Sequence, residues 1–247
     1  MTISACVWPS PPQNLLLPAN AVHVWCADLD LSEIRLQHLR QTVSVDENNR
    51  ADRFYFDRHR KRFIAAHGIL REILGRYLEV KPEWLEYSYG SRGKPAIAGM
   101  DSDINFNLSH KNNFALCAVT RNRLIGIDIE FLRPVREVES LAENNFCPQE
   151  FEVIRSLPSG KKEEAFFNAW TRKEAYLKAT GEGLAGLGSV EVSLVPGEPA
   201  AVLRIEGAVQ TARRWSMRHL LPAQGYVAAL AVEGRDWNLS CFKVDCA

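Results

Sequence analysis

The chain has 247 residues, of which 46% are hydrophobic and 24% charged, a composition typical of a globular protein that excludes disordered and collagen-like chains. Thirty Lys and Arg balance thirty Asp and Glu, so net charge favours neither nucleic acid nor a membrane surface as a general partner. Six cysteines without a CxxC pair, and no apolar run near the ~20 residues that span a bilayer, favour a reduced, cytoplasmic protein.

The first half of the chain is predicted to contain one long helix and four strands. Residues 1–18 are interrupted by prolines and are expected to form a loosely attached arm. Apolar residues recur at helical spacing over 54–79, whereas 88–97 is rich in Gly and Pro and is predicted to be a turn. Alternating or continuous apolar runs predict strands at 21–29, 104–110, 114–120 and 124–130.

The second half is predicted to contain helices and then strands. A helical stretch includes residues 148–154, and a longer helix covers about 161–180 and ends at Gly181, a residue suited to the C-cap. Strands are expected at 190–195, 213–220, 225–233 and 241–245.

Two segments of the chain resemble each other. Residues 106–110 (FNLSH) followed by FALCAV are similar to 215–219 (WSMRH) followed by YVAALAV, and a long helix precedes each segment. Chance similarity between two strands is the alternative to a true repeat. A repeat predicts an α+β fold of two similar halves that meet near residue 122, with a cleft between them for a ligand.

The strand at 125–130, IGIDIE, carries two acids within an otherwise apolar run. Residues two apart in a strand share a face, so Asp128 and Glu130 lie side by side while Ile127 and Ile129 point the other way. Neighbouring carboxylates repel each other. We therefore expect these acids to lack charge compensation until a cation binds between them.

A third acid lies in the helix that contains WTRKEAYLK, residues 170–178. Glu174 and Lys178 are one turn apart, and an exposed pair of this kind contributes only ~0.3–0.5 kcal/mol. Because the pair adjoins the apolar stripe of the helix, Glu174 is instead predicted to face Asp128 and Glu130. Three carboxylates without Cys or His suit Mg²⁺, and Lys178 would then meet a phosphate.

Positive charge gathers in residues 50–62, which contain six Lys or Arg and two Asp. A solvated helix surface is the simplest explanation of most of these charges. Arg50, Arg53 and Arg62, together with Lys94 in a Gly-Lys-Pro turn, are nevertheless predicted to line an anion pocket. His110 is predicted to join them, because it ends a strand where loops carry function.

Four segments in order carry a resemblance to a known family. GKP (93–95), FNLSH (106–110), IGIDIE (125–130) and WTRKEAYLK (170–178) resemble the motif series of the Sfp-type 4′-phosphopantetheinyl transferases. The resemblance implies a monomer with a pseudo-twofold α+β fold of two α/β halves, 1–122 and 123–247, with coenzyme A bound between them. It also implies transfer of the phosphopantetheine arm to a serine of an acyl or peptidyl carrier protein of fatty acid, polyketide or peptide synthesis.

The resemblance assigns roles to residues of this chain by position. The Mg²⁺ ligands are expected to be Asp128, Glu130 and Glu174. Contacts to coenzyme A are expected from Arg50, Arg62, Lys94, Ser109, His110 and Lys178. Within that set Lys178 corresponds to the pyrophosphate lysine, and Lys94 and His110 to contacts with the 3′-phosphate. Glu47 departs from the pattern, since this position is basic in some members.

The implied reaction sets the catalytic roles. The carrier serine attacks the β-phosphorus of coenzyme A, and 3′,5′-ADP leaves. Glu174, directly or through a metal-bound water, is the expected proton acceptor, and Lys178 adds positive charge beside the Mg²⁺.

Two other functions remain open at this point. Another Mg²⁺-dependent phosphate-transfer enzyme would use the same carboxylates, although the chain lacks a GxxxxGK[ST] loop. A non-catalytic carrier-binding module would have lost the carboxylates or Lys178, and all four side chains are present.

Overall fold

The computed structural model describes residues 8–245 and contains two central β-sheets. The strands of the larger sheet, in spatial order, are β11 (Asn238–Lys243), β1 (Ala21–Asp28), β5 (Phe114–Arg121) and β4 (Ile104–Lys111). The strands of the smaller sheet are β6 (Ile125–Phe131), β10 (Tyr226–Glu233) and β9 (Trp215–Leu220). The two long helices are α3 (Asp57–Leu78) and α6 (Ser159–Thr180).

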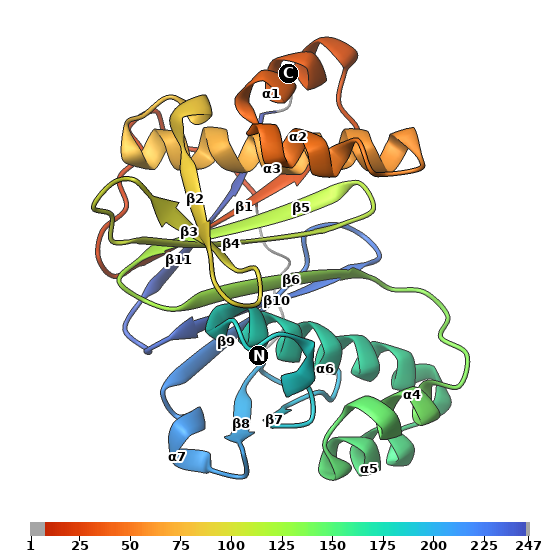
Figure 1. Cartoon of the computed structure of the whole chain (residues 1–247). Helices are drawn as coiled ribbons and strands as arrows, with labels where there is room; N and C mark the ends of the chain where they lie inside the picture. Colours follow the sequence, from red (N-terminus) through yellow and green to blue (C-terminus); the bar gives the residue numbers. More distant parts are fainter. Residues whose placement is uncertain (1–7, 246–247) are drawn as a thin grey trace.

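The sheets lie face to face, and α3 and α6 cover their outer faces (Figure 1). Alternation along the strands produces this layering, because Val24 and Ile127 point into the core between the sheets while their sequence neighbours face the helices. Helix α3 buries Phe63 and Leu74 against the larger sheet, on the apolar stripe that the sequence predicts.

The two halves repeat the same arrangement of elements. The order β1, α3, β4, β5 in the first half matches β6, α6, β9, β10 in the second. In both sheets the third and last strand of the unit lies between the first and second strands and pairs antiparallel with each. The predicted α+β fold of two similar halves is therefore confirmed. Strand β11 lies outside this repeat, because it pairs parallel with β1 in the larger sheet.

Shorter helices and strands flank the two sheets and the two long helices. On the first half they are α1 (Glu33–Thr42), α2 (Val45–Ala51), η1 (Pro82–Trp84), β2 (Glu86–Tyr89) and β3 (Pro95–Ala98). On the second half they are α4 (Val138–Asn145), α5 (Pro148–Ser156), η2 (Leu184–Gly186), β7 (Val190–Val192), β8 (Val202–Ile205) and α7 (Val209–Ala212). Within residues 8–245, no helix combines the length and apolarity that a membrane span requires.

The structure corrects two local predictions. Residues 88–97 form a hairpin of β2 and β3 around a tight turn, in which Gly90 N donates to Lys94 O at 2.9 Å and Gly93 has a φ of 80°. Helices α1 and α2 were not predicted, because α1 buries only Leu36, Leu39 and Thr42 and shows no continuous apolar stripe. Part of the expected N-terminal arm, residues 1–7, lies outside the described residues.

Gly126 allows α6 to lie directly on β6. A Cβ atom at this position would be 2.0 Å from the carbonyl oxygen of Ala175 and 2.4 Å from the backbone nitrogen of Ala179. No other residue permits this approach of strand and helix backbones. The contact brings the part of α6 that carries Glu174 and Lys178 next to the acids of β6.

Replacing Gly126 with Ala is expected to destabilise the protein by at least about 2 kcal/mol, because the added methyl group would push two backbones apart. Gly160→Ala is the matched control, since it lies in the first turn of α6 with nothing within 4 Å of the new Cβ. The control should change stability by less than about 1 kcal/mol. Urea unfolding measures both values, and equal stabilities of the two variants would contradict the close contact.

Candidate active site

The functional side chains gather at the seam where the edge strands β4 and β6 of the two sheets meet. Asn107 on β4 joins the edges, because its Oδ1 accepts a hydrogen bond from the backbone nitrogen of Ile127 at 2.9 Å. The end of α6 lies over the same seam. Residues from three separate parts of the sequence therefore share one site.

Asp128 is the centre of this site. It is 4% exposed, and its Oδ1 accepts hydrogen bonds from Ser109 Oγ at 2.9 Å and from Lys178 Nζ at 2.5 Å. Lys178 Nζ also donates to Ser109 Oγ at 3.0 Å. The other oxygen, Oδ2, is buried and accepts no hydrogen bond from the described residues. Asp128, Ser109 and Lys178, all predicted from the sequence, thus form one hydrogen-bonded cluster. Within it, Oδ2 of Asp128 remains an unused acceptor.

Glu130 has a lysine partner of its own. Lys111, at the end of β4, places its Nζ 2.6 Å from Glu130 Oε2. The expectation that Asp128 and Glu130 lack compensation before a cation binds is therefore wrong, because Lys178 and Lys111 neutralise them. The reason is that β4 lies beside β6 at the edge of the neighbouring sheet and α6 packs on β6, so both lysines reach the acids.

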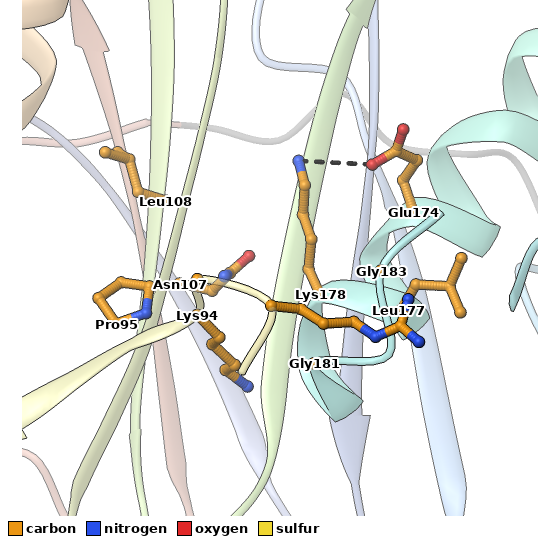
Figure 2. Close-up of a pocket in the computed structure, with 11 residues that line it drawn as sticks. Lys94, Pro95, Asn107, Leu108, Glu174, Leu177, Lys178, Gly181 and Gly183 are labelled. Atoms are coloured by element: carbon orange, nitrogen blue, oxygen red, sulfur yellow. Dashed lines mark ion pairs between the residues drawn. The ribbon is translucent and has the colours of Figure 1, made fainter. Parts of the chain in front are cut away.

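Glu174 lies one helical turn before Lys178, and Figure 2 shows the two side chains reaching toward each other from α6. Its Oε2 is 4.0 Å from Lys178 Nζ. Burial raises the pKa of Glu174, the neighbouring charges of Asp128 and Glu130 raise it further, and Lys178 opposes them. Asp128 and Glu130 are thus close enough to Glu174 to affect its ionisation.

The carboxylates suit a hard cation in their chemistry. All donors are oxygens, and the unused Oδ2 of Asp128 is the kind of buried acceptor that a cation satisfies. Within residues 8–245, however, no three carboxyl, imidazole or thiol side chains converge closely enough to ligate one ion. In the present arrangement Lys111 pairs with Glu130 and Lys178 pairs with Asp128.

Two cavities share part of their walls, one of them borders Glu174, and together they are called the groove. The central cavity has a volume of about 310 Å³, with the Gly93–Pro95 turn on one side and Glu174 and Lys178 on the other (Figure 2). A basic cavity of about 170 Å³ is lined by Arg50, His67 and His110, among others. The walls common to both are Gly93, Pro95, Asn107 and Leu108.

The structure brings some of the predicted cationic residues to the basic cavity. The Arg50 guanidinium lies over the ring of Phe63, 5.4 Å from its centroid. His110 has an exposed side chain, yet the surrounding protein lowers its pKa to about 4, and the charges of His67 and two lysines add to this effect. Arg62 instead forms two hydrogen bonds of 2.7 Å with Asp30, because it lies on the face of α3 that meets the end of β1.

Lys94 lines the central cavity, but its ammonium group points to backbone carbonyls. Its Nζ donates to Ala179 O at 2.5 Å and to Ile125 O at 3.3 Å. Burial lowers the pKa of Lys94 to about 8. The side chain therefore ties the Gly-Lys-Pro turn to the end of α6 and the start of β6, and in this structure its ammonium group does not meet His110 in the basic cavity.

Three residues of the site were missed by the sequence analysis. Lys111 and Asn107 act across the seam between β4 and β6, which no spacing in the sequence indicates. His67 lies four residues after Phe63 and stacks on its ring, and this face of α3 also borders the basic cavity.

Two family models match successive parts of the chain. The family model described as "4′-phosphopantetheinyl transferase, N-terminal" matches residues 30–122, and the model of the "4′-phosphopantetheinyl transferase superfamily" matches residues 124–231.

Curated relatives carry the same activity in their names. The chain is 50% identical over 233 residues to the 4′-phosphopantetheinyl transferase HetI of Nostoc sp., which covers 94% of this chain and 95% of that protein. It is 30% identical over 161 residues to psf-1 of Bacillus pumilus, covering 65% of this chain and 67% of that protein. It is 25% identical over 158 residues to Sfp of Bacillus subtilis, covering 64% and 69%. The motif resemblance is confirmed, and the chain belongs to the 4′-phosphopantetheinyl transferase superfamily.

Proposed function

We propose that this enzyme transfers the 4′-phosphopantetheine arm of coenzyme A to a serine of an apo acyl or peptidyl carrier protein and releases 3′,5′-ADP. One observation carries the proposal: Asp128, Ser109 and Lys178 meet beside two further carboxylates at one end of a groove whose other end is basic. The name of the relative HetI supports the reaction class. Cations line both cavities, and the carboxylate cluster lies beside the central one, an arrangement that suits a donor with both a pyrophosphate and a separate phosphate.

Coenzyme A is proposed to lie along the groove. Its 3′-phosphate would bind in the basic cavity near Arg50 and His110, and its pyrophosphate would meet Lys178 in the central cavity. Ser109 accepts a hydrogen bond from Lys178 and would help to hold that ammonium group in place. Lys94 borders the same groove with its stem, while its ammonium group fastens the helix end. The donor would then contact both halves, 1–122 and 123–247, of a monomeric enzyme.

Asp128, Glu130 and Glu174 are the side chains that would hold Mg²⁺. When bound, Mg²⁺ would supply positive charge to the pyrophosphate oxygens. Lys178 is close enough to Asp128 to supply a second positive charge at the same end of the groove. Both charges favour departure of an anionic leaving group.

The carrier serine needs a proton acceptor as its Oγ attacks the β-phosphorus. Glu174 is the proposed acceptor, because burial and the neighbouring acids raise its pKa toward the range that suits a general base. The Oγ–P bond forms, the bond from the β-phosphorus to the bridging oxygen breaks, and 3′,5′-ADP leaves with that oxygen. The serine proton passes to the Glu174 carboxylate.

Incubation with apo carrier protein, coenzyme A and Mg²⁺ is expected to add one phosphopantetheine group per carrier, measured by intact-protein mass spectrometry. Glu174→Gln should lower the rate by about 10²–10⁴-fold. Glu164→Gln is the matched control, because Glu164 lies on the same helix and pairs only with the exposed Lys161 among the described residues. Undiminished transfer in excess EDTA would contradict the role of Mg²⁺, and equal rates of the two variants would contradict the role of Glu174.

Asp128→Asn is expected to lower the stability of the ligand-free protein by about 1–3 kcal/mol, because it leaves Lys178 without its buried anion. Lys178→Met should also destabilise, since Asp128 would lose its cation. The double variant should lose at least about 1 kcal/mol less than the sum of the single losses. Urea unfolding of the four proteins gives the coupling energy, and an Asp128→Asn protein as stable as wild type would show that the carboxylate is unpaired before ligands bind.

A further inference from the structure

Glu47 is a buried acid that the proposed reaction does not use. It is 1% exposed, and it caps α2 through a reciprocal pair of hydrogen bonds with Ser44. Its Oε2 accepts from Arg71 Nε at 2.7 Å, and its Oε1 lies 3.0 Å from His67 Nδ1. Both carboxylate oxygens of Glu47 therefore have partners, and Oε1 holds the ring of His67.

His67 is held on two sides. Its ring stacks on Phe63 with the centroids 4.1 Å apart, while Glu47 holds Nδ1. The remaining ring nitrogen is Nε2. His67 lines the basic cavity together with Arg50 and His110, so this cavity is where a ligand meets the unengaged part of the ring.

The charges around His67 favour an anionic ligand. The charged side chains are Glu47 and Arg50 on α2 and Arg71 on α3. The other titratable side chains nearby are Tyr87 and Tyr89 on β2 and His110 on β4. Burial raises the pKa of Glu47, but hydrogen bonds from His67 and Ser44 and the charge of Arg71 outweigh this and lower it to about 2. Glu47 is thus ionised above this pH, and because a carboxylate only accepts hydrogen bonds, Nδ1 of His67 is the donor in the contact between them.

We propose that His67 is a further contact to the 3′-phosphate of coenzyme A, and that Glu47 is the positioning residue that orients it. A dianionic phosphate monoester in the basic cavity would place the imidazole between two anions, a setting that favours the doubly protonated ring. His67 would then donate from Nε2 to the phosphate and from Nδ1 to Glu47. This inference rests on the proposed function, which assigns coenzyme A to the groove.

The contacts of Glu47 require an acid at this position. A basic residue at this position could not accept the buried hydrogen bonds from Arg71 and His67. With an acid there, the chain gains a fixed imidazole that faces the cavity from α3. The 3′-phosphate would accordingly be recognised by one arginine and two histidines, Arg50, His67 and His110.

Calorimetric titration of the full chain with coenzyme A and with 3′-dephospho-coenzyme A tests this role. His67→Gln should weaken binding of coenzyme A by about tenfold and change binding of the dephosphorylated donor by less than about twofold. Glu47→Gln should weaken coenzyme A in the same selective way. His59→Gln is the matched control, because it lies on the same helix with an exposed side chain. Thermal melts of each variant establish that it is folded.

A second readout concerns protons. In two buffers of different ionisation enthalpy at about pH 7.5, wild type should take up more protons with coenzyme A than with the dephosphorylated donor, and His67→Gln should reduce this difference. If His67→Gln loses the same affinity for both donors, His67 only supports the fold. If its affinities are unchanged, His67 does not contact the ligand. Either result overturns the inference. If wild type itself fails to distinguish the two donors, the placement of coenzyme A in the proposed function fails as well.

Discussion

The ion pair between Asp128 and Lys178 is the interaction on which the rest of the site depends. Asp128 on β6 is 4% exposed and needs a compensating charge, which α6 supplies through Lys178 because the helix lies directly on that strand. Gly126 removes the side chain that would keep α6 away from β6. Ser109, from the opposite sheet, bonds to both members of the pair. The same three side chains therefore connect the two sheets and neutralise the acid.

The groove combines binding and architecture in the same residues. Lys94 borders the central cavity, and its ammonium group also caps Ala179 O at the end of α6. Asn107 contributes to the wall shared by both cavities and also joins β4 to β6. A donor lying along this groove would touch the side chains that hold the two sheets together, so binding and stability are expected to be coupled.

Local patterns in the sequence predicted the elements that carry the chemistry. The alternation in IGIDIE, the i, i+4 spacing of Glu174 and Lys178 and the glycine after α6 each reflect the period or the end of one element. The ion pair of Lys111 with Glu130 could not be predicted, because it depends on which edges of two sheets meet. The direction of the Lys94 ammonium group and the burial of Glu47 likewise depend on neighbours distant in sequence.

The central claim is that the chain's own lysines neutralise the acids that a divalent cation would occupy. Titration with Mn²⁺, followed by electron paramagnetic resonance in the absence of coenzyme A, tests this claim directly, since Mn²⁺ accepts the same oxygen ligands as Mg²⁺. Lys178→Met should bind Mn²⁺ at least about tenfold more tightly than wild type, a difference of about 1.4 kcal/mol, because the ion no longer displaces an ammonium group. Lys161→Met, on the exposed first turn of α6, is the control and should bind as wild type does. Equal or weaker binding by Lys178→Met would contradict the claim.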